Sequence, residues 1–488
     1  MIPVSCGQIA VAVGGELAGV DPATMIRARG DAAVVIDSRK ITPGGLFVAL
    51  PGENVDGHDF VPAATAAGAT ASLTTRPIEG CPCIVVPDAQ KALGELARLV
   101  VSQLPELVVV GLTGSQGKTS TKDLIAQLLR PYGETVAPVG SFNNELGHPL
   151  TALEADEKTR FLVAEMGARH VGDITHLCRI TPPKVGVVLN VGQSHLGEFG
   201  SQDAIAQAKG ELIEAVIPGG TAVLNADDPR VAAMAGRTGQ TVTTFGEAAE
   251  ADVRAGQITL DAGGRPGFTL HVGDFSRDIR LQLVGEHQVS NALAAAAAVL
   301  ALGLTADQVA DGLNSAVAVS KWRMEVTERA DGVTVINDTY NANPDSVRAA
   351  LKALVAIGRA RAAQPGGGQT GGAQTGGAQA GGGRTWAVLG EMRELGDAAM
   401  REHDAIGRLA VRLDVNRLVA VTEAARPIHL GASLEGSWGN ESAYAETIDE
   451  ALDLLRKELQ PGDVVLVKAS RAAGLDRLAA ALLEEASQ

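Results

Sequence analysis

The stretch VVVGLTGSQGKTSTKD (108–123) most constrains the fold, because a β-branched run leads into a glycine-rich loop and then into helix-forming residues. Gly114 and Gly117 let the backbone turn tightly, so that its N–H groups can point at an anion. Lys118 can reach the β- and γ-phosphates of a nucleotide, and the Thr119 hydroxyl can bind Mg²⁺. A solvated lysine in an ordinary glycine turn is the alternative, but strand, loop and helix occur here in order. The predicted ATP-binding loop consists of Thr113, Gly114, Ser115, Gln116, Gly117, Lys118 and Thr119.

The loop does not have the spacing of the common nucleotide-binding pattern G-x-x-x-x-G-K-[ST]. Counting back from Gly117, the position that this pattern reserves for glycine holds Leu112. The sequence reads T-G-x-x-G-K-T instead, from Thr113 to Thr119. The spacing therefore indicates an ATP site from a different family of phosphate-binding loops.

The length of the chain indicates more than one domain. With 488 residues it is too long for a single hydrophobic core and should divide into about three. Residues 1–104 alternate short apolar runs with glycine turns and alanine-rich stretches, which predicts a small α/β domain. We expect a central domain over 105–320 and a C-terminal domain over 321–488.

The central and C-terminal segments both alternate apolar strands with helices, so an α/β fold is expected for each. LVVV, FLVAEMGA, KVGVVLNVG and TAVLNADDP suit a buried parallel sheet, and period-two stretches between about 252 and 285 indicate an antiparallel edge. A helix should begin near Asn291, where asparagine would serve as the cap. In the last segment VTVIND, TWAVLGEM, RLVAVTE and DVVLVKAS favour a Rossmann-like, doubly wound sheet.

The C-terminal segment also holds the tract QPGGGQTGGAQTGGAQAGGG (364–383). Its glycine, glutamine and threonine residues cannot bury apolar surface. We predict a flexible loop insertion without a functional role.

Composition disfavours several classes of function. The formal net charge of −16 disfavours nucleic-acid binding. The N-terminus lacks a basic region, and the longest apolar run (292–302) is far shorter than the roughly 20 residues that span a bilayer. The 4 cysteines lack zinc or redox spacing, which predicts free thiols in a reducing compartment. We expect a soluble, monomeric protein of the cytoplasm.

Three further residues of the central segment are candidates for chemistry. Glu165 ends the apolar run FLVAE, a sound position for a Mg²⁺ ligand or a water-organising carboxylate, although a solvent-facing glutamate is the alternative. His195 follows another strand-like run, where a structural histidine is the alternative. Lys209 lies on a probable helix.

These motifs resemble those of the Mur ligase superfamily, whose phosphate-binding loop has the T-G-x-x-G-K-T spacing found here. The resemblance implies that His195, in its N-x-x-x-x-H-L context, is associated with a metal. It also implies that Lys209 is carbamylated and helps to bind a second Mg²⁺. The implied catalytic residues are Lys118, Glu165, His195 and Lys209, and the implied metal ligands are Thr119, Glu165, His195 and carbamylated Lys209.

Further along the chain, the resemblance points to one branch of the family. YNANPDS, VLGEMRELG and VLVKASRAAGL resemble the ligases that join D-alanyl-D-alanine to UDP-N-acetylmuramoyl-tripeptide, although Ala469 stands where that branch usually has glycine. By this resemblance, Asn291 contacts the nucleotide base, Arg323 the phosphates, Asp338 the ribose and Tyr340 the adenine. An ordinary turn is the alternative for NANP. The expected substrate-binding residues here are Asn143, Asn144, Asn341, Asn343, Lys468, Ser470 and Arg471.

The N-terminal segment agrees with this resemblance. Residues 37–69 resemble the UDP-binding segment shared by the third and fourth ligases of peptidoglycan synthesis. By that resemblance, Ser38 and Arg39 would face the UDP-sugar. Residues 56–58 would shape a nearby loop. A plain surface loop is the alternative.

The resemblance implies ATP and Mg²⁺ as cofactors. The γ-phosphoryl group would pass to the terminal carboxylate of the tripeptide, and the amine of D-alanyl-D-alanine would attack the resulting acyl phosphate. No side-chain nucleophile is required, so catalysis consists of positioning and electrostatics. We expect the C-terminal domain to close after ATP binds, bringing Arg323, Asp338 and Tyr340 onto the nucleotide.

Three other interpretations remain open. The preceding ligase, which adds the third amino acid, typically carries DNPR in its C-terminal domain when it uses diaminopimelate, whereas DDPR (227–230) lies here in the central segment. A folylpolyglutamate-synthase-like enzyme would share the loop but not the UDP-binding segment. A non-catalytic nucleotide-binding regulator would not need the metal ligands.

Overall fold

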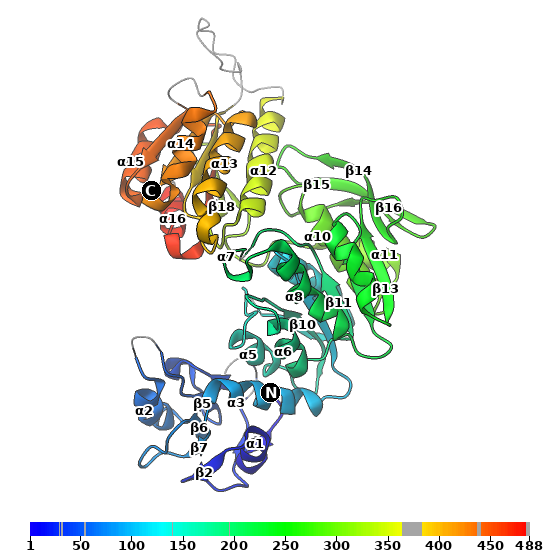
Figure 1. The fold of residues 1–488 in the computed structure, drawn as a ribbon, viewed down its shortest axis with the longest axis vertical. Coiled ribbons are helices and arrows are strands. Elements are labelled where there is room, and N and C mark those ends of the chain that lie inside the picture. Colours follow the sequence, from blue (N-terminus) through cyan, green and yellow to red (C-terminus); the bar gives the residue numbers. More distant parts are fainter. Residues whose placement is uncertain are drawn as a thin grey trace, which may run out of the picture.

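A computed structural model of the protein describes residues 1–28, 30, 33–52, 55–138, 140–194, 196–363, 383–436 and 441–484. The chain forms three α/β domains, and the first and last lie at opposite ends of the molecule (Figure 1). The predicted metal ligand His195 lies outside the described residues, as does the predicted flexible insertion except for Gly383.

The N-terminal domain is built on a five-stranded sheet that is parallel except at β2. Its strands, in spatial order, are β2 (Glu16–Ala18), β7 (Cys83–Val85), β6 (Ala71–Thr74), β5 (Leu46–Val48) and β4 (Val34–Val35), beside a separate pair, β1 (Val4–Ser5) and β3 (Met25–Ile26). Its helices are α1 (Cys6–Val13), α2 (Val61–Ala66) and α3 (Ala89–Ser102). The Asp88 side chain caps α3, which buries Leu93, Leu96 and Val100 along one apolar face.

The central domain contains a nine-stranded sheet. Its strands, in spatial order, are β16 (Phe275–Arg280), β15 (Pro266–Val272), β14 (Val253–Leu260), β13 (Thr241–Gly246), β12 (Thr221–Asn225), β11 (Val185–Val188), β8 (Val108–Thr113), β10 (Thr159–Glu165) and β9 (Glu134–Val136). In this spatial order, all strands from β14 to β9, including β8, are parallel. Strands β15 and β16 add antiparallel pairs at one edge. The predicted parallel sheet with an antiparallel edge is confirmed, although the last of these strands ends at Arg280 rather than near 285.

The register of this sheet brings the residues with predicted chemical roles to one edge. Glu165 of β10 pairs with Leu112 of β8, and Val188 of β11 pairs with Thr113 on the other side. Because parallel strands end at the same edge, the loops that follow β8, β10 and β11 meet there.

Helices cover both faces of the central sheet. Helices α4 (Lys118–Leu129), α10 (Gln288–Leu300) and α11 (Ala306–Ser315) share a core on one face. On the other face, α6 (Asp173–Ile180) and α8 (Gln202–Glu214) share a core with α3, so the N-terminal and central domains pack together. The remaining helices are α5 (Gly147–Ala152), α7 (Leu196–Phe199) and α9 (Pro229–Ala232).

The C-terminal domain has the predicted doubly wound sheet, which is parallel except at β17. Its strands, in spatial order, are β17 (Glu325–Glu328), β18 (Thr334–Asp338), β22 (Val464–Lys468), β19 (Thr385–Leu389), β20 (Arg417–Val421) and β21 (Ser442–Ala445). One face is covered by α12 (Pro344–Ala362), α13 (Ala399–Arg412) and α14 (Arg426–Leu434), and the other by α15 (Ile448–Glu458) and α16 (Asp476–Glu484).

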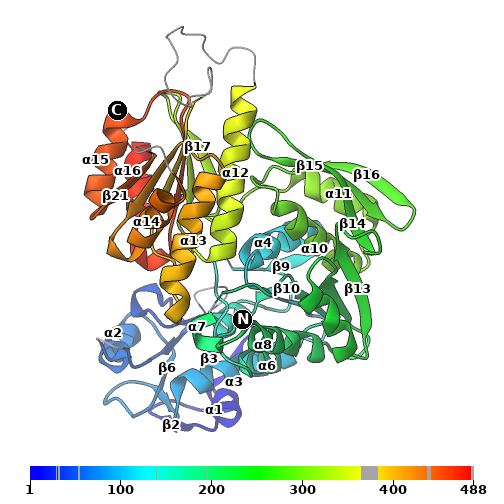
Figure 2. The ribbon, with the colours of Figure 1, turned by 45° about the horizontal axis from the view of Figure 1, so that its top comes forward.

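Helix α12 also contacts the central domain. It lies beside the β14–β15 hairpin in both views (Figures 1 and 2). The turn of that hairpin comes so close that a Cβ atom at Gly264 would lie 2.5 Å from Ile357 of α12. The two domains are therefore packed together along this helix.

The cysteines and helices agree with two expectations from the sequence. Cys6, Cys83 and Cys178 are buried, Cys81 is half-buried, and all four are free thiols. Within the described part of the chain, no helix combines the length and apolar character needed to cross a membrane.

Candidate active site

A cavity of about 770 Å³ lies between the central and C-terminal domains. Its walls come from the loop after β8, the end of β10, the start of α10 and the ends of β18 and β22. The cavity brings together residues that are far apart in the sequence. The predicted site residues that line it are Ser115, Gln116, Gly117, Lys118, Thr119, Asn143, Asn144, Glu165, Lys209, Asn291, Arg323, Asp338, Tyr340, Asn341, Asn343, Lys468, Ser470 and Arg471.

The glycines of the phosphate-binding loop are required by its geometry. Gly117 has φ +82° and directly precedes α4, and a Cβ atom there would overlap Oδ1 of Asn291. At Gly114 a Cβ atom would lie 2.8 Å from Leu189. Both glycines permit close approach, and Gly117 also supplies a left-handed backbone that other residues rarely adopt.

Asn190 supports this loop, a role that the sequence analysis missed. Its Oδ1 accepts the backbone N–H groups of Ser115 and Gln116 at 2.9 and 3.0 Å, and its Nδ2 donates to the Gln116 carbonyl at 3.2 Å. The only local signal is an asparagine that follows the apolar run VGVVL. Because these two amides are bound to Asn190, the N–H groups at the start of α4 are the ones left to face an anion.

Lys118 folds back over its own loop. Its Nζ donates to the Gly114 carbonyl at 2.8 Å. Burial lowers the pKa of this amine, and the nearby Glu165 carboxylate acts in the opposite direction. The side chain is thus already inside the cavity, within reach of a phosphate bound at the helix start.

Thr119 and Glu165 form the polar centre of the cavity. Thr119 Oγ1 donates to Glu165 Oε2 at 3.0 Å, and Glu165 Oε1 accepts from Ser141 Oγ and Asn143 Nδ2, each at 2.7 Å. Adjacent oxygens around octahedral Mg²⁺ lie about 2.9 Å apart, given Mg–O distances of about 2.0–2.1 Å. The 3.0 Å separation of these two oxygens therefore fits a shared Mg²⁺.

The metal-binding side chains in this region would leave coordination positions for the oxygens of a nucleotide. Among the described residues, no group of three or more histidine, cysteine, aspartate or glutamate side chains could hold a metal ion alone. Magnesium usually keeps several waters and binds one or two carboxylates together with substrate phosphates. The donor set at Thr119 and Glu165 is of that kind.

Lys209 lies on α8, as predicted, and its side chain is buried in the cavity wall. Burial, together with the positive charge of Lys118, lowers the pKa of its amine well below the usual value. An uncharged amine is the form that reacts with CO₂, so the environment suits the predicted carbamylation.

Arg323 enters the cavity from the C-terminal side. Its Nη2 donates to Thr119 Oγ1 at 2.8 Å, and its guanidinium lies 4.1 Å from the centre of the Tyr340 ring. Trp322 and Met324, on either side of it, have φ values of +60° and +50°. Non-glycine residues in this region of backbone space are strained and cluster at functional sites.

Arg471 lies on the same wall. Its guanidinium stacks 3.8 Å from the centre of the Trp322 ring. The segment that carries Arg323 therefore contacts Tyr340 and Arg471, which follow β18 and β22.

Asp338 and Lys468 form a buried ion pair at 2.6 Å. Asp338 also accepts the Met324 N–H at 3.1 Å, and Lys468 also donates to the Asn341 carbonyl at 2.8 Å. Burial lowers the pKa of Lys468, and its contact with Asp338 opposes that effect. Neighbouring parallel strands β18 and β22 end on these two residues, which explains why they meet.

Asn291 lies in the cavity wall, and the alternative interpretation, a helix cap, is wrong. The cap residue of α10 is His287, and the helix begins at Gln288, so Asn291 lies within the first turn. Its Nδ2 donates to Gln288 Oε1 at 2.9 Å, and its Oδ1 faces Gly117. The asparagine therefore packs against a glycine of the neighbouring loop from within the helix.

The remaining predicted residues that the structure describes lie away from the cavity wall. Thr113 is buried at the end of β8. Gly114 belongs to the phosphate-binding loop but does not line the cavity. Ser38 and Arg39 form a short helical turn of the N-terminal domain, where the Arg39 guanidinium lowers the pKa of Asp37 to about 2. The structure does not bring these two residues to the cavity.

Several residues of the cavity wall were missed from the sequence. Arg393 and Glu394 lie within the motif VLGEMRELG, and Asn190 and His287 each had a local signal, but none of these was assigned to the site. The missed residues are Ser141, Arg169, His170, His176, Asn190, His287, Gln288, Arg393 and Glu394.

The fold and the cavity define a three-domain α/β nucleotide-binding enzyme. The chain belongs to the Mur ligase family. The family profiles described as "Mur ligase family, catalytic domain", "Mur ligase middle domain" and "Mur ligase, glutamate ligase domain" match residues 32–100, 112–299, and 322–365 with 372–471, respectively.

Similar proteins cover nearly the whole chain. The sequence is 50% identical to UDP-N-acetylmuramoyl-tripeptide–D-alanyl-D-alanine ligase of Mycobacterium tuberculosis, over 99% of this chain and 98% of that one. It is 34% identical to the Escherichia coli protein of the same name, over 99% of both chains. A crystal structure of MurF from Acinetobacter baumannii has a TM-score of 0.84 at 33% identity, over 99% of both chains. MurF ligase from Thermotoga maritima, in complex with ADP, has a TM-score of 0.78 at 28% identity, over 94% of this chain and 98% of that one.

Proposed function

We propose that this chain is the ATP-dependent ligase that joins D-alanyl-D-alanine to UDP-N-acetylmuramoyl-tripeptide and releases ADP and phosphate, in peptidoglycan precursor synthesis. The relatives that are 50% and 34% identical over 99% of the chain carry that activity in their names. The single structural observation behind the proposal is the shared cavity. It joins the nucleotide loop and Glu165 of one domain to Lys468 and Arg471 of another.

The reaction needs two substrates beside one nucleotide. The γ-phosphoryl group passes to the tripeptide carboxylate, the amine of D-alanyl-D-alanine attacks the acyl phosphate carbon, and phosphate leaves. Lys118, Arg323 and the N–H groups at the start of α4 hold the phosphate oxygens and offset their negative charge. Mg²⁺, when bound, supplies further charge neutralisation at these oxygens.

The proposed metal ligands are Thr119, Glu165, carbamylated Lys209 and His195. The first two support the proposal through the spacing of their oxygens, and Lys209 through its buried amine, whose pKa is lowered by burial. His195 is proposed from the family resemblance alone, because it lies outside the described residues.

Substrate contacts are proposed from family resemblance and position. Asn291, Asp338 and Tyr340 would surround the nucleoside, and Ser38 and Arg39 would contact UDP. The cavity-lining residues proposed to bind the peptide substrates are Asn143, Asn144, Asn341, Asn343, Lys468, Ser470 and Arg471.

Domain limits, compartment and assembly remain proposals. Divisions near 104 and 320 are supported by the sheets, since each domain's strands come from one segment. We also propose a cytoplasmic monomer, and the buried free thiols suit a reducing compartment. Light scattering on the purified chain tests the monomer.

The alternatives have weaker support. The structure of UDP-N-acetylmuramoyl-L-alanyl-D-glutamate–2,6-diaminopimelate ligase has a TM-score of 0.53 at 18% identity, a likeness of fold alone. The deciding assay measures ADP release with UDP-N-acetylmuramoyl-tripeptide, comparing D-alanyl-D-alanine with single amino acids and testing lysine and diaminopimelate tripeptides. Turnover only with a single amino acid would refute the proposal.

Lys118→Ala provides the matched test of the loop. It should abolish ADP release while the protein stays folded, and the exposed Lys158→Ala should release ADP at the wild-type rate. Unchanged turnover in Lys118→Ala would remove the loop from the mechanism.

A further inference from the structure

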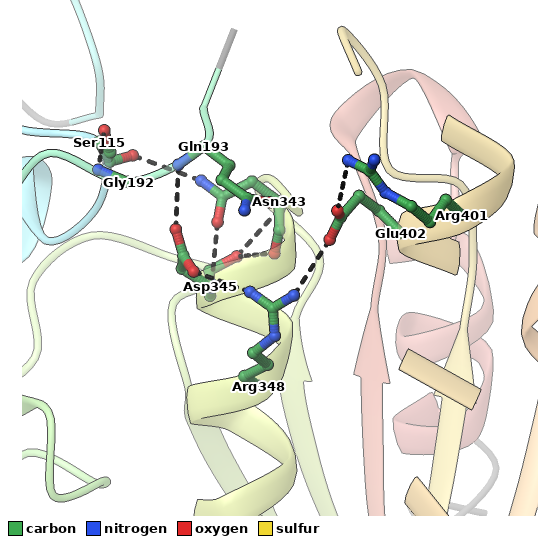
Figure 3. Close-up of polar contacts among 9 residues, drawn as sticks. Ser115, Gly192, Gln193, Asn343, Asp345, Arg348, Arg401 and Glu402 are labelled. Atoms are coloured by element: carbon green, nitrogen blue, oxygen red, sulfur yellow. Dashed lines mark hydrogen bonds and ion pairs between the residues drawn. The ribbon is translucent and has the colours of Figure 1, made fainter. Parts of the chain in front are cut away.

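The first turn of α12 contacts two loops of the central domain (Figure 3). Asp345 Oδ2 accepts the backbone N–H of Gln193 at 3.1 Å, and Asn343 Nδ2 donates to the Ser115 carbonyl at 3.3 Å. Gly192, beside Gln193, donates its N–H to Ser115 Oγ at 2.8 Å. Ser115 of the phosphate-binding loop is therefore held by the loop after β11 and by the C-terminal domain.

The contact at Asp345 is tight enough to require glycine in the opposite loop. A Cβ atom at Gly192 would overlap Asp345 Oδ2. A side chain at position 192 would displace the Asp345 carboxylate and break its hydrogen bond to Gln193. The backbone at Gly192 and Gln193 therefore lies in close contact with the Asp345 carboxylate across the domain boundary.

A chain of charged side chains orients the Asp345 carboxylate. Arg348 Nη1 donates to Asp345 Oδ1 at 2.9 Å, and Arg348 Nη2 donates to Glu402 of α13 at 3.0 Å. The Glu402 side chain is only 7% exposed and also pairs with Arg401. Such charge-assisted hydrogen bonds are stronger and more directional than neutral ones. They fix the carboxylate in the direction of Gln193.

A purely local role for Asp345 at the helix start does not explain this geometry. The cap of α12 is Asn343, which accepts the Ser346 N–H at 2.8 Å, while Ser346 Oγ accepts the Asn343 N–H at 3.0 Å. Within the described part of the chain, Asp345 hydrogen-bonds to Gln193 and Arg348 and to no amide of its own helix. Its carboxylate is therefore used across the interface.

We propose that Asp345 is a positioning residue for the ligase reaction. By binding the Gln193 N–H, it sets the loop that follows β11, and with it Ser115 of the phosphate-binding loop, when the C-terminal domain is docked. The inference rests on the proposed function and assigns a new residue to it. Asp345 acts through the backbone of residues 192–193 and touches no substrate.

The test compares Asp345→Ala and Asp345→Asn with Asp453→Ala, which removes an exposed aspartate that has the same i,i+3 pairing with an arginine. Asp345→Ala should lower kcat about tenfold or more and leave KM for ATP within about threefold, because docked geometry and not nucleotide binding is lost. Asp345→Asn should also lower kcat, since its amide cannot accept from both Gln193 and Arg348. Asp453→Ala should match the wild type.

Arg348→Met adds a second test. Because Arg348 acts through Asp345, kcat should fall less in Arg348→Met than in Asp345→Ala. The double variant should be no slower than Asp345→Ala alone. Additive losses would overturn the proposal. So would a kcat within about twofold of wild type in either Asp345 variant that keeps the wild-type Tm.

Hydrogen exchange separates this inference from the proposed function. Without any substrate, the Gln193 amide should exchange faster in Asp345→Ala than in the wild type, and equal rates would overturn the contact. If wild-type protein does not release ADP with the proposed substrates, the proposed function fails. The exchange comparison still decides whether Asp345 holds the loop.

Discussion

Arg323 donates from Nη2 to Thr119 Oγ1 at 2.8 Å, so a side chain from the C-terminal side of the cavity lies on the first turn of the nucleotide-loop helix. The two residues are 204 positions apart in the sequence. Among the described residues, Nε of Arg323 is buried without a hydrogen-bond partner. A phosphate oxygen that loses water on binding is stabilised by a hydrogen bond from a positively charged donor. Arg323 therefore joins the two domains and keeps one buried donor unused.

Replacing Arg323 should affect turnover more than folding. In Arg323→Met, the charge and the unused donor are lost, and kcat for ADP release should fall about a hundredfold or more. Arg323→Lys should recover little, because an ammonium cannot present a planar pair of donors. The control is Arg359→Met, which removes an exposed arginine of α12. Steady-state ADP release measures all three, and wild-type kcat in Arg323→Met would contradict the assignment.

Gly117→Ala should abolish nucleotide binding. An alanine must adopt φ near +82° and would overlap Asn291 Oδ1. Such backbone strain costs about 1–3 kcal/mol before the overlap is counted. Calorimetric titration with ADP measures the loss. Asn291→Ala, added to Gly117→Ala, removes the overlap but leaves the strain and also deletes a proposed nucleoside contact, so ADP binding should recover little.

Gly236→Ala is the matched control for the Gly117 variant. Gly236 has no positive φ, and nothing lies within 4 Å of a Cβ atom built there. Its ADP affinity should equal that of the wild type. Unaltered ADP binding in Gly117→Ala would show that the loop can shift and that this glycine is not required.

Lys209 should carry a carbamate. Burial and the nearby Lys118 charge lower the pKa of this amine well below its usual value, which favours the uncharged form that reacts with CO₂. Protein incubated with ¹³C-labelled bicarbonate should show a carbamate resonance that Lys209→Met lacks. Activity should fall when CO₂ is removed and return with bicarbonate. A resonance that persists in Lys209→Met would assign the carbamate elsewhere.

His148 should make the fold sensitive to acid. Burial lowers the pKa of this imidazole from 6.5 to about 4 in the folded protein. Between these two pH values the unfolded chain binds a proton that the folded chain does not, so stability decreases as the pH falls and is unaffected above 6.5. The full loss is about 3 kcal/mol.

The variant that tests this prediction is His148→Gln, which can keep the 2.8 Å hydrogen bond to Thr181. The Tm of the wild type should fall more steeply than that of the variant between pH 7 and pH 5, by an amount equivalent to about 2 kcal/mol. Other titrating groups contribute equally to both proteins. Parallel Tm curves would show that folding does not lower the pKa of this imidazole.

The parts of the site that depend on local sequence could be predicted. A strand, a glycine loop and a helix follow one another directly at Lys118, and Glu165 ends an apolar run, so each residue's position follows from its immediate neighbours. Family resemblance extended the prediction to Arg323, Lys468 and Arg471, which the structure brings into the same cavity. Local pattern and motif order were sufficient for these residues.

Contacts between distant segments could not be predicted in this way. Asn190 and Ser115 are 75 residues apart, and Asp345 and Gln193 are 152 apart, so no periodicity connects them. Asn291 shows a related limit. Asparagine favours helix caps, yet here close packing against Gly117 places it inside the helix. A tertiary contact overrode the local preference.

The stacking of Trp322 on Arg471 gives the protein a built-in optical reporter. The chain has 3 tryptophans, and Trp386 is completely buried in the C-terminal core, where a ligand in the cavity leaves its surroundings unchanged. Trp322 borders Arg323 and lies against a charged group at the cavity wall. Indole emission depends on nearby charge and water. In a variant with tryptophan only at position 322, fluorescence can therefore report changes around Arg323 and Arg471 at the cavity wall, without an attached dye.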